Sequence, residues 1–234
     1  MGRPRINTKR ATILSVLNYK SVISMLTMNY LDISESLRSK LGRMYEALRV
    51  ARIEKLPDFA LVSDDSVAPG FYGADFSQGR NDADMRNAAA TLISNIASLK
   101  DHLKVWCKRH SREFSGDRLI NSNFDVAVVH DLWNLDKHAE LIGSRSGRFP
   151  VLGHMQQAIE VTVNGSGGMC LNMDLQKGQA KPSSIGDASL ALVLSASVQD
   201  HAGAFIGNLL SICERAVVAW ENEFVRVGFI PPLR

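Results

Sequence analysis

The sequence predicts a mainly α-helical protein of the α+β class, an antiparallel helical bundle with a small antiparallel β insert before its last helix. Two observations predict this fold. Apolar residues recur in steps of three and four along several long segments, whereas one segment near the C-terminal end alternates apolar and polar residues around a glycine-rich stretch. The 234 residues, of which 45% are hydrophobic, suffice for one domain over 1–234.

The helices are predicted from apolar spacing, and capping residues mark several of their ends. They cover residues 11–30, 31–54, 82–109, 124–142 and 199–227. Asn81 or Asp82 is expected to cap the third helix and Asn123 the fourth, and Gly228 is expected to end the last one. The last helix carries two adjacent apolar stripes, with Phe205 in the first, and this wide apolar arc favours a homodimer.

The remaining segments are predicted as loops or strands. Residues 63–80 and 112–123 are expected to be loops. Residues 158–198 form the predicted β-rich insert, in which Asn164–Gly168 supplies the turn of a hairpin. A loop rich in glycine, proline and serine follows that hairpin, and a third strand begins at Ala188.

Composition excludes several classes of protein. No apolar run approaches the ~18 residues that a membrane-spanning helix needs, so no membrane partner is expected. The N-terminal segment lacks the pattern of a secretory signal. Cys107, Cys170 and Cys213 lie far apart, which argues against disulfides and a structural zinc site and favours a reducing cytoplasm. No cofactor is expected. The net charge of +3 does not by itself indicate nucleic-acid binding.

One helical segment carries the residues most suited to chemistry. On a helix over 124–142, Asp131, Asn134 and His138 share one polar face, and His130 borders this group. A carboxylate beside an imidazole fixes the tautomer of the ring and raises its pKa, which improves a proton shuttle at neutral pH. The same residues equally fit a polar pair that anchors the helix to a neighbour.

The sequence HDLWNLDKHAEL in this segment resembles a motif of largely uncharacterised bacterial helical proteins, L-x-x-L-x-N-x-D-K-H-R-x-L. Their upstream L-R-x-x-L-D-H-L helix has a counterpart here that keeps Asp101 and His102 but has Ala97 in place of the arginine. Ala139 likewise replaces the arginine that follows His138. The order of elements over residues 82–227 agrees with the layout of those proteins.

That set is similar in turn to HEPN domains, helical bundles that often act as ribonucleases or as partners of nucleotidyltransferases, in toxin–antitoxin and defence systems. The resemblance implies a homodimer and a metal-independent ribonuclease in which His138 is the acid or base. Asn134 would orient the phosphate, Asp131 would support the imidazole, and Lys137 or Arg145 would supply positive charge. Trp133 stands where the HEPN motif has its arginine, so the resemblance supports the fold more than the activity.

Several cations could hold a phosphate-bearing ligand such as RNA near this segment. Lys104, Lys108 and Arg109 extend a stripe of cations that begins at Lys100, and the same spacing also fits an ordinary solvated helix face. Arg145 and Arg148, in a loop rich in glycine and serine just after the motif, also lie within reach of such a ligand.

Two other classes stay open. The sequence AVVHDL resembles the core of metal-dependent HD phosphohydrolases, which implies a metal site made of His110, His130 and Asp131. The second is a non-catalytic helical module that binds a partner protein, such as a nucleotidyltransferase. The HEPN-like motif without its arginine fits this class equally well.

Overall fold

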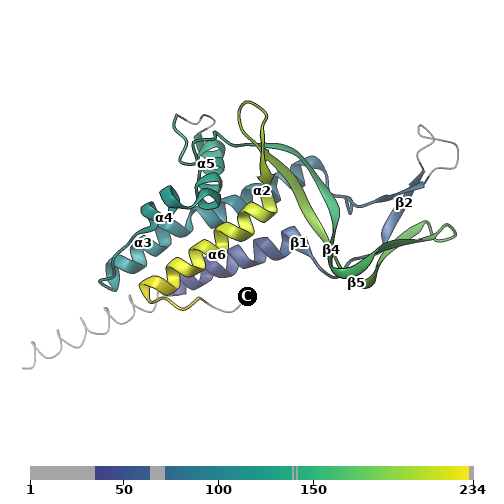
Figure 1. Cartoon of the computed structure of the whole chain (residues 1–234), viewed down its shortest axis with the longest axis horizontal. Coiled ribbons are helices and arrows are strands. Elements are labelled where there is room, and N and C mark those ends of the chain that lie inside the picture. Colours follow the sequence, from purple (N-terminus) through teal and green to yellow (C-terminus); the bar gives the residue numbers. More distant parts are fainter. Residues whose placement is uncertain (1–34, 64–71, 139, 141, 232–234) are drawn as a thin grey trace, which may run out of the picture.

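The computed structural model describes residues 35–63, 72–138, 140 and 142–231, and shows a helical body from which a long sheet projects (Figure 1). The prediction of a mainly helical bundle with a small β insert is wrong. The described part is an α+β protein with a six-stranded antiparallel sheet. The predicted helix over 11–30 and the start of the helix over 31–54 lie outside the described residues.

The sheet is built around one long hairpin of two strands, β4 and β5. It begins seven residues before the predicted insert, and its second strand runs without interruption into the segment predicted as a separate third strand from Ala188. The strands are β1 (Arg52–Ile53), β2 (Phe59–Ser63), β3 (Tyr72–Asp75), β4 (Val151–Asp174), β5 (Gln179–Gln199) and β6 (Phe205–Asn208). Strand β5 pairs with β4 along nearly its whole length and with β1, β2 and β6 at its other edge, and β3 pairs with β2.

The hairpin turns at residues 175–178, not at the predicted Asn164–Gly168. The carboxylate of Asp174 accepts hydrogen bonds from the amides of Gln176 and Lys177, and Gly178 adopts a positive φ of 62°. This Asp-to-Gly turn is ordinary turn chemistry. The glycine-rich stretch instead lies within β4, where the register shifts between Val163 and Gly167.

The helical body contains a helix over 35–51 and five more helices. These are α2 (Asp82–Ala97), α3 (Leu99–Arg109), α4 (Gly116–Ser122), α5 (Phe124–His138) and α6 (Leu209–Val227). The caps predicted at Asn81 and Asn123 are confirmed, since their side chains accept bonds from the amides of Asp84 and Val126. Gly228, with φ of 89°, ends α6 as predicted.

Several predicted helix bounds are wrong for local reasons. The single helix predicted over 82–109 is interrupted at Ser98, whose hydroxyl bonds to the carbonyl of Ser94 and competes with the helical hydrogen bonds. The loop predicted over 112–123 contains α4, and the helix predicted over 124–142 ends at His138. Within the predicted helix over 199–227, residues 205–208 are strand β6.

The core lies between the helices and the adjacent half of the sheet. The apolar arc of α6 is buried there, with Leu209, Ile212, Ala216 and Phe224 fully shielded from solvent. The apolar arc of α6 is therefore buried within a single chain, so it does not require the homodimer that the sequence favoured. No helix among the described residues has both the length and the apolar character needed to cross a bilayer.

Candidate functional site

Asp131 of α5 holds the loop over residues 143–148 against the helix. Its side chain is fully buried. Its carboxylate accepts bonds from Ser144 Oγ at 2.7 Å, Arg145 N at 2.8 Å, Ser146 N at 2.9 Å and Ser146 Oγ at 2.8 Å. Because these bonds engage both carboxylate oxygens, the loop that carries Arg145 and Arg148 is fixed to the middle of α5.

The predicted group of Asp131, Asn134 and His138 does not form. Asp131 bonds to the loop, and Asn134 bonds to His130. His138, the last residue of α5, is exposed, and its imidazole forms no hydrogen bond with a described residue. Residues seven apart share a helix face but stand about 10 Å apart along the axis, so a shared face did not produce contact.

His130 is a buried imidazole paired with Asn134. The Asn134 Nδ2 group lies 3.0 Å from His130 Nδ1, and because an amide nitrogen only donates, the ring accepts at Nδ1 and carries its proton on Nε2. Burial lowers the pKa of His130, and the nearby cations Lys100 and Arg145 lower it further. The ring is therefore neutral at physiological pH.

Three cations from two separate segments gather around Asp117 of α4. Lys100 Nζ of α3 lies 2.7 Å from the Asp117 carboxylate, and its hydrogen bond lowers the pKa of that carboxyl group, with further contributions from Arg145 and Lys104. The guanidinium of Arg145 also donates to Asn121 Oδ1 at 2.7 Å. We call Lys100, Lys104 and Arg145 the basic cluster.

The basic cluster only partly matches the predicted ligand-binding residues. The sequence indicated Lys104 and Arg145, and the structure brings them together, with Lys100 as a third member that its four-residue spacing from Lys104 could have identified. Lys108 and Arg109 lie further along α3, towards its C-terminal end. Lys137 lies over the ring of Trp133, 5.0 Å from its centroid.

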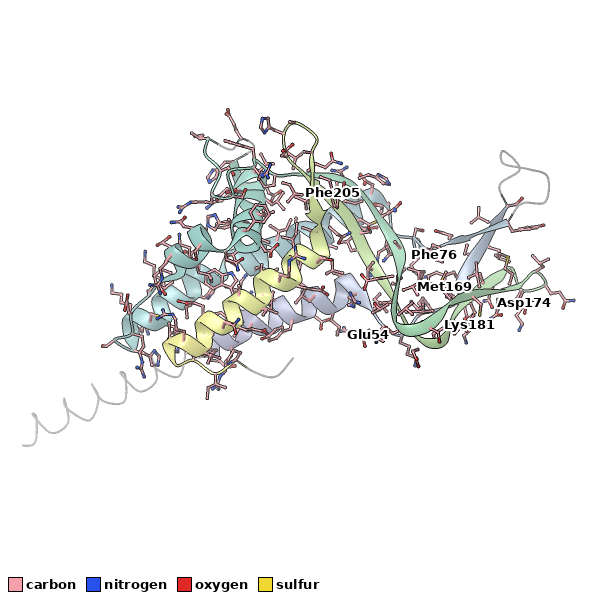
Figure 2. The ribbon with its side chains drawn as sticks, viewed as in Figure 1. Glu54, Phe76, Met169, Asp174, Lys181 and Phe205 are labelled. Atoms are coloured by element: carbon pink, nitrogen blue, oxygen red, sulfur yellow. The ribbon has the colours of Figure 1, made fainter. Side chains whose placement is uncertain are left out.

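Arg148, from the same loop as Arg145, lies at a small pocket with two exposed aromatic rings. The pocket has a volume of about 230 Å³ and is lined by Phe124, Arg148, Asp200, Ala204, Phe205 and Ile206. Phe205 is 71% exposed and Phe124 is 47% exposed. We call Phe124, Arg148 and Phe205 the aromatic pocket. Figure 2 labels Phe205 where the sheet meets the helical body.

Sequence reasoning missed the aromatic pocket because it placed Phe205 in the buried stripe of a helix. The residue instead belongs to β6, and the helix begins only at Leu209, where the side chain of Asn208 caps it by accepting a bond from the Leu210 amide. The signal that could have indicated this is Gly207-Asn208, because glycine disfavours a helix interior and asparagine favours its cap.

The residues proposed as metal ligands do not come together. His110 Nδ1 lies 2.9 Å from the carbonyl of Trp106, and its ring stacks on that indole. His130 is paired with Asn134, and Asp131 with the loop. The part of the chain that the structure describes holds no group of three or more histidine, cysteine or acidic side chains able to bind a metal ion.

A larger open groove of about 1010 Å³ lies between the helix over 35–51 and α6. Most of the charges around it are engaged in ion pairs. Arg49 pairs with Glu46, Arg52 with Glu160 and Glu214, and Arg215 with Asp125. The groove therefore presents little uncompensated charge with which to select an ionic ligand.

Comparison of the chain with protein-family models, with curated proteins and with solved structures found no match.

Proposed function

We propose that the chain binds single-stranded RNA, with the basic cluster contacting phosphates and the aromatic pocket holding an unstacked base. Proteins that bind single strands combine cations along the backbone with aromatic rings on which bases stack. The observation that carries the proposal is that Lys100 of α3 and Arg145 of the loop, from two separate segments, both bond to side chains of α4, at Asp117 and Asn121. The preference for RNA over DNA rests on the resemblance to HEPN domains.

The loop over 143–148 joins the two parts of the proposed site. Arg145 belongs to the basic cluster and Arg148 to the aromatic pocket, and Asp131 holds the loop that carries both. A strand that contacts both arginines would follow this loop, with a phosphate near Arg145 and a base between Phe124 and Phe205. A pocket of about 230 Å³ suits one base and not a stacked duplex.

We propose binding without cleavage. Cleavage at the ribose needs an acid or base and a cation placed around one phosphate. His138 has no described partner that would orient its ring, and both Asp131 and Asn134 are engaged elsewhere. This supports the alternative of a non-catalytic binding module. A nucleotidyltransferase partner and a role in a toxin–antitoxin or defence system are implied by the resemblance alone and stay predictions.

Replacing two members of the basic cluster tests phosphate binding. We expect the double variant Lys104→Ala/Arg145→Ala to bind a labelled RNA of about 12 nucleotides about tenfold more weakly. The slope of log affinity against log salt should fall by about 1.4, since each lost contact to a single strand removes about 0.7. Fluorescence anisotropy at several KCl concentrations measures both quantities.

The matched control is Lys177→Ala/Lys181→Ala, which removes the same charge from the sheet, where both lysines are exposed. If both double variants weakened RNA binding equally, the lysines and arginines would act by general electrostatic attraction, and this result would contradict the proposed site. The same samples, run on a denaturing gel, test cleavage. RNA shortened by wild type and left intact by His138→Ala would replace binding with the ribonuclease hypothesis.

The aromatic pocket has a separate test. We expect Phe205→Ala to weaken binding about tenfold with an unchanged salt slope, because stacking contributes about 1–3 kcal/mol per base and involves no counterion. Because the Phe205 side chain is exposed, its removal should leave the fold intact. The control is Tyr72→Ala, an exposed aromatic on β3. Equally tight binding of duplex RNA would contradict a pocket for an unstacked base.

A further inference from the structure

The long hairpin has two edges that differ in their pairing. Strand β4 pairs with β5 and with no other described strand, so its outer edge is open from Val151 to Asp174. Strand β5 is covered at its other edge by β2 at residues 179–180, by β1 at 192–193 and by β6 at 197–199. Among the described strands, that edge is therefore unpaired over residues 181–191 and 194–196.

The two open edges also differ in sequence. The open part of β5 contains Lys181, Pro182 and Asp187, the residue types that prevent an edge strand from pairing with another chain. In contrast, residues 161–173 of β4 read VTVNGSGGMCLNM, with no charged residue and no proline. Glu160, just before this stretch, is paired with Arg52 at 2.5 Å. The β4 edge thus lacks side-chain protection along 13 residues.

The same stretch exposes apolar side chains away from the core. Val161 and Val163 are exposed, as are Met169 and Met173. Figure 2 shows Met169, Asp174 and Lys181 along the part of the hairpin that extends away from the helices. Near its turn the hairpin is extended by β2 and β3 on the β5 side only, so a further strand on the β4 side would enlarge this part of the sheet and stabilise it.

We propose that residues 167–173 of β4 pair antiparallel with the same residues of a second copy of this chain. The bulge between Val163 and Gly167 separates these residues from the rest of the strand, and they keep a continuous register with β5. Pairing a strand with itself about a two-fold axis satisfies both open edges with one interface. It also places uncharged residues opposite uncharged residues, so no like charges meet.

This pairing stops at two copies. In the described part of each chain, residues 167–173 are the unprotected edge that keeps a continuous register with β5, and the dimer pairs both copies of this edge. The edges that remain are the part of β4 before the bulge, the part of β5 that Lys181, Pro182 and Asp187 protect, and the outer edges of β1, β3 and β6, which are two to four residues long. A strand from a different protein would also pair with β4 if it carried no charge and no proline. The β4 strand of a second copy already has these properties.

The test is the mass of the intact chain in solution, measured by light scattering after size exclusion. We expect twice the chain mass of 25.7 kDa for wild type at about 100 μM and a single chain mass for Met169→Lys/Met173→Lys. With the axis at Cys170, the ammonium groups introduced at position 169 of the two copies lie diagonally across the interface and repel, and each one introduced at position 173 places a charge opposite Gly167. The matched control is Val218→Lys/Val225→Lys, on the exposed side of α6, which should stay dimeric.

Hydrogen exchange gives a second measurement that needs no variant. The amides of residues 167–173 should gain protection as wild type is concentrated from about 1 to about 100 μM, while those of the β5 stretch 181–191 should not. A wild-type monomer at the higher concentration overturns the proposal. So does a dimer that survives the two lysines in β4, a control that dissociates, or protection at 167–173 that is independent of concentration.

Discussion

Asp131→Ala is expected to lower the free energy of unfolding by about 3 kcal/mol, because it removes a buried acceptor of four hydrogen bonds. The backbone amides of Arg145 and Ser146 and two serine hydroxyls lose their partner. A donor that is buried without a partner costs about 1–3 kcal/mol, and part of this cost is relieved as the loop moves into water. Denaturant unfolding of both proteins measures the difference.

Two further variants show whether the loss of stability depends on the Asp131 carboxylate or would follow the removal of any acidic residue from α5. Asp136→Ala, on the exposed side of the same helix, should change stability by no more than about 0.5 kcal/mol. Asp131→Asn keeps one carbonyl acceptor and should fall between the two. RNA affinity of folded Asp131→Ala should also drop, since Arg145 is no longer held in the basic cluster. A loss of stability below about 1 kcal/mol would contradict the role of Asp131.

The fold was predictable where local chemistry determines structure. Asn81 and Asn123 satisfy helix amides within their own first turns, and Gly228 supplies the left-handed conformation that ends α6. The extent of the sheet was not predictable in this way. Residues 164–167 are exposed within β4, so no buried face marks them as part of a strand, and their glycines resemble a turn.

The sequence predicted which residues carry the charges of the candidate site, but not which residues bond to one another. Lys104 was indicated by its four-residue spacing from Lys100, and Arg145 and Arg148 by their position just after the motif segment. The partner of Asp131 was not, because it depends on how the loop after α5 folds back, which no helical spacing encodes. The shared helix face of Asp131 and His138 suggested a catalytic pair, whereas the two side chains lie in different environments, one buried and one exposed.

A second buried carboxylate, Glu223 of α6, ties that helix to the start of α4. Ser115 Oγ donates to Glu223 at 2.6 Å, and Arg226 donates to both carboxylate oxygens at 2.8 Å. Glu223 is 7% exposed. The hydrogen bond from Arg226 lowers the pKa of Glu223 more than burial raises it, and the bond from Ser115 lowers it further. The ionised form is therefore the one that the folded protein favours.

Glu223→Gln is expected to lower the free energy of unfolding by about 2 kcal/mol at pH 7, because it removes or weakens three charge-assisted hydrogen bonds. The folded pKa lies below the unfolded value of about 4.5, so the unfolded chain takes up a proton first as the pH falls. The contribution of the carboxylate is thus complete above pH 4.5 and is lost as the pH falls through the folded pKa. Wild type and variant should converge in that range.

Urea unfolding of both proteins at about pH 7, 5.5, 4 and 3 measures this convergence. Glu35→Gln, which removes an exposed carboxylate at the other end of the described chain, should follow wild type at each pH. A difference between wild type and Glu223→Gln that stays constant down to pH 3 would attribute the loss to altered packing. The convergence itself would show that the charge on Glu223 is what holds Ser115 and Arg226, and with them the start of α4, against α6.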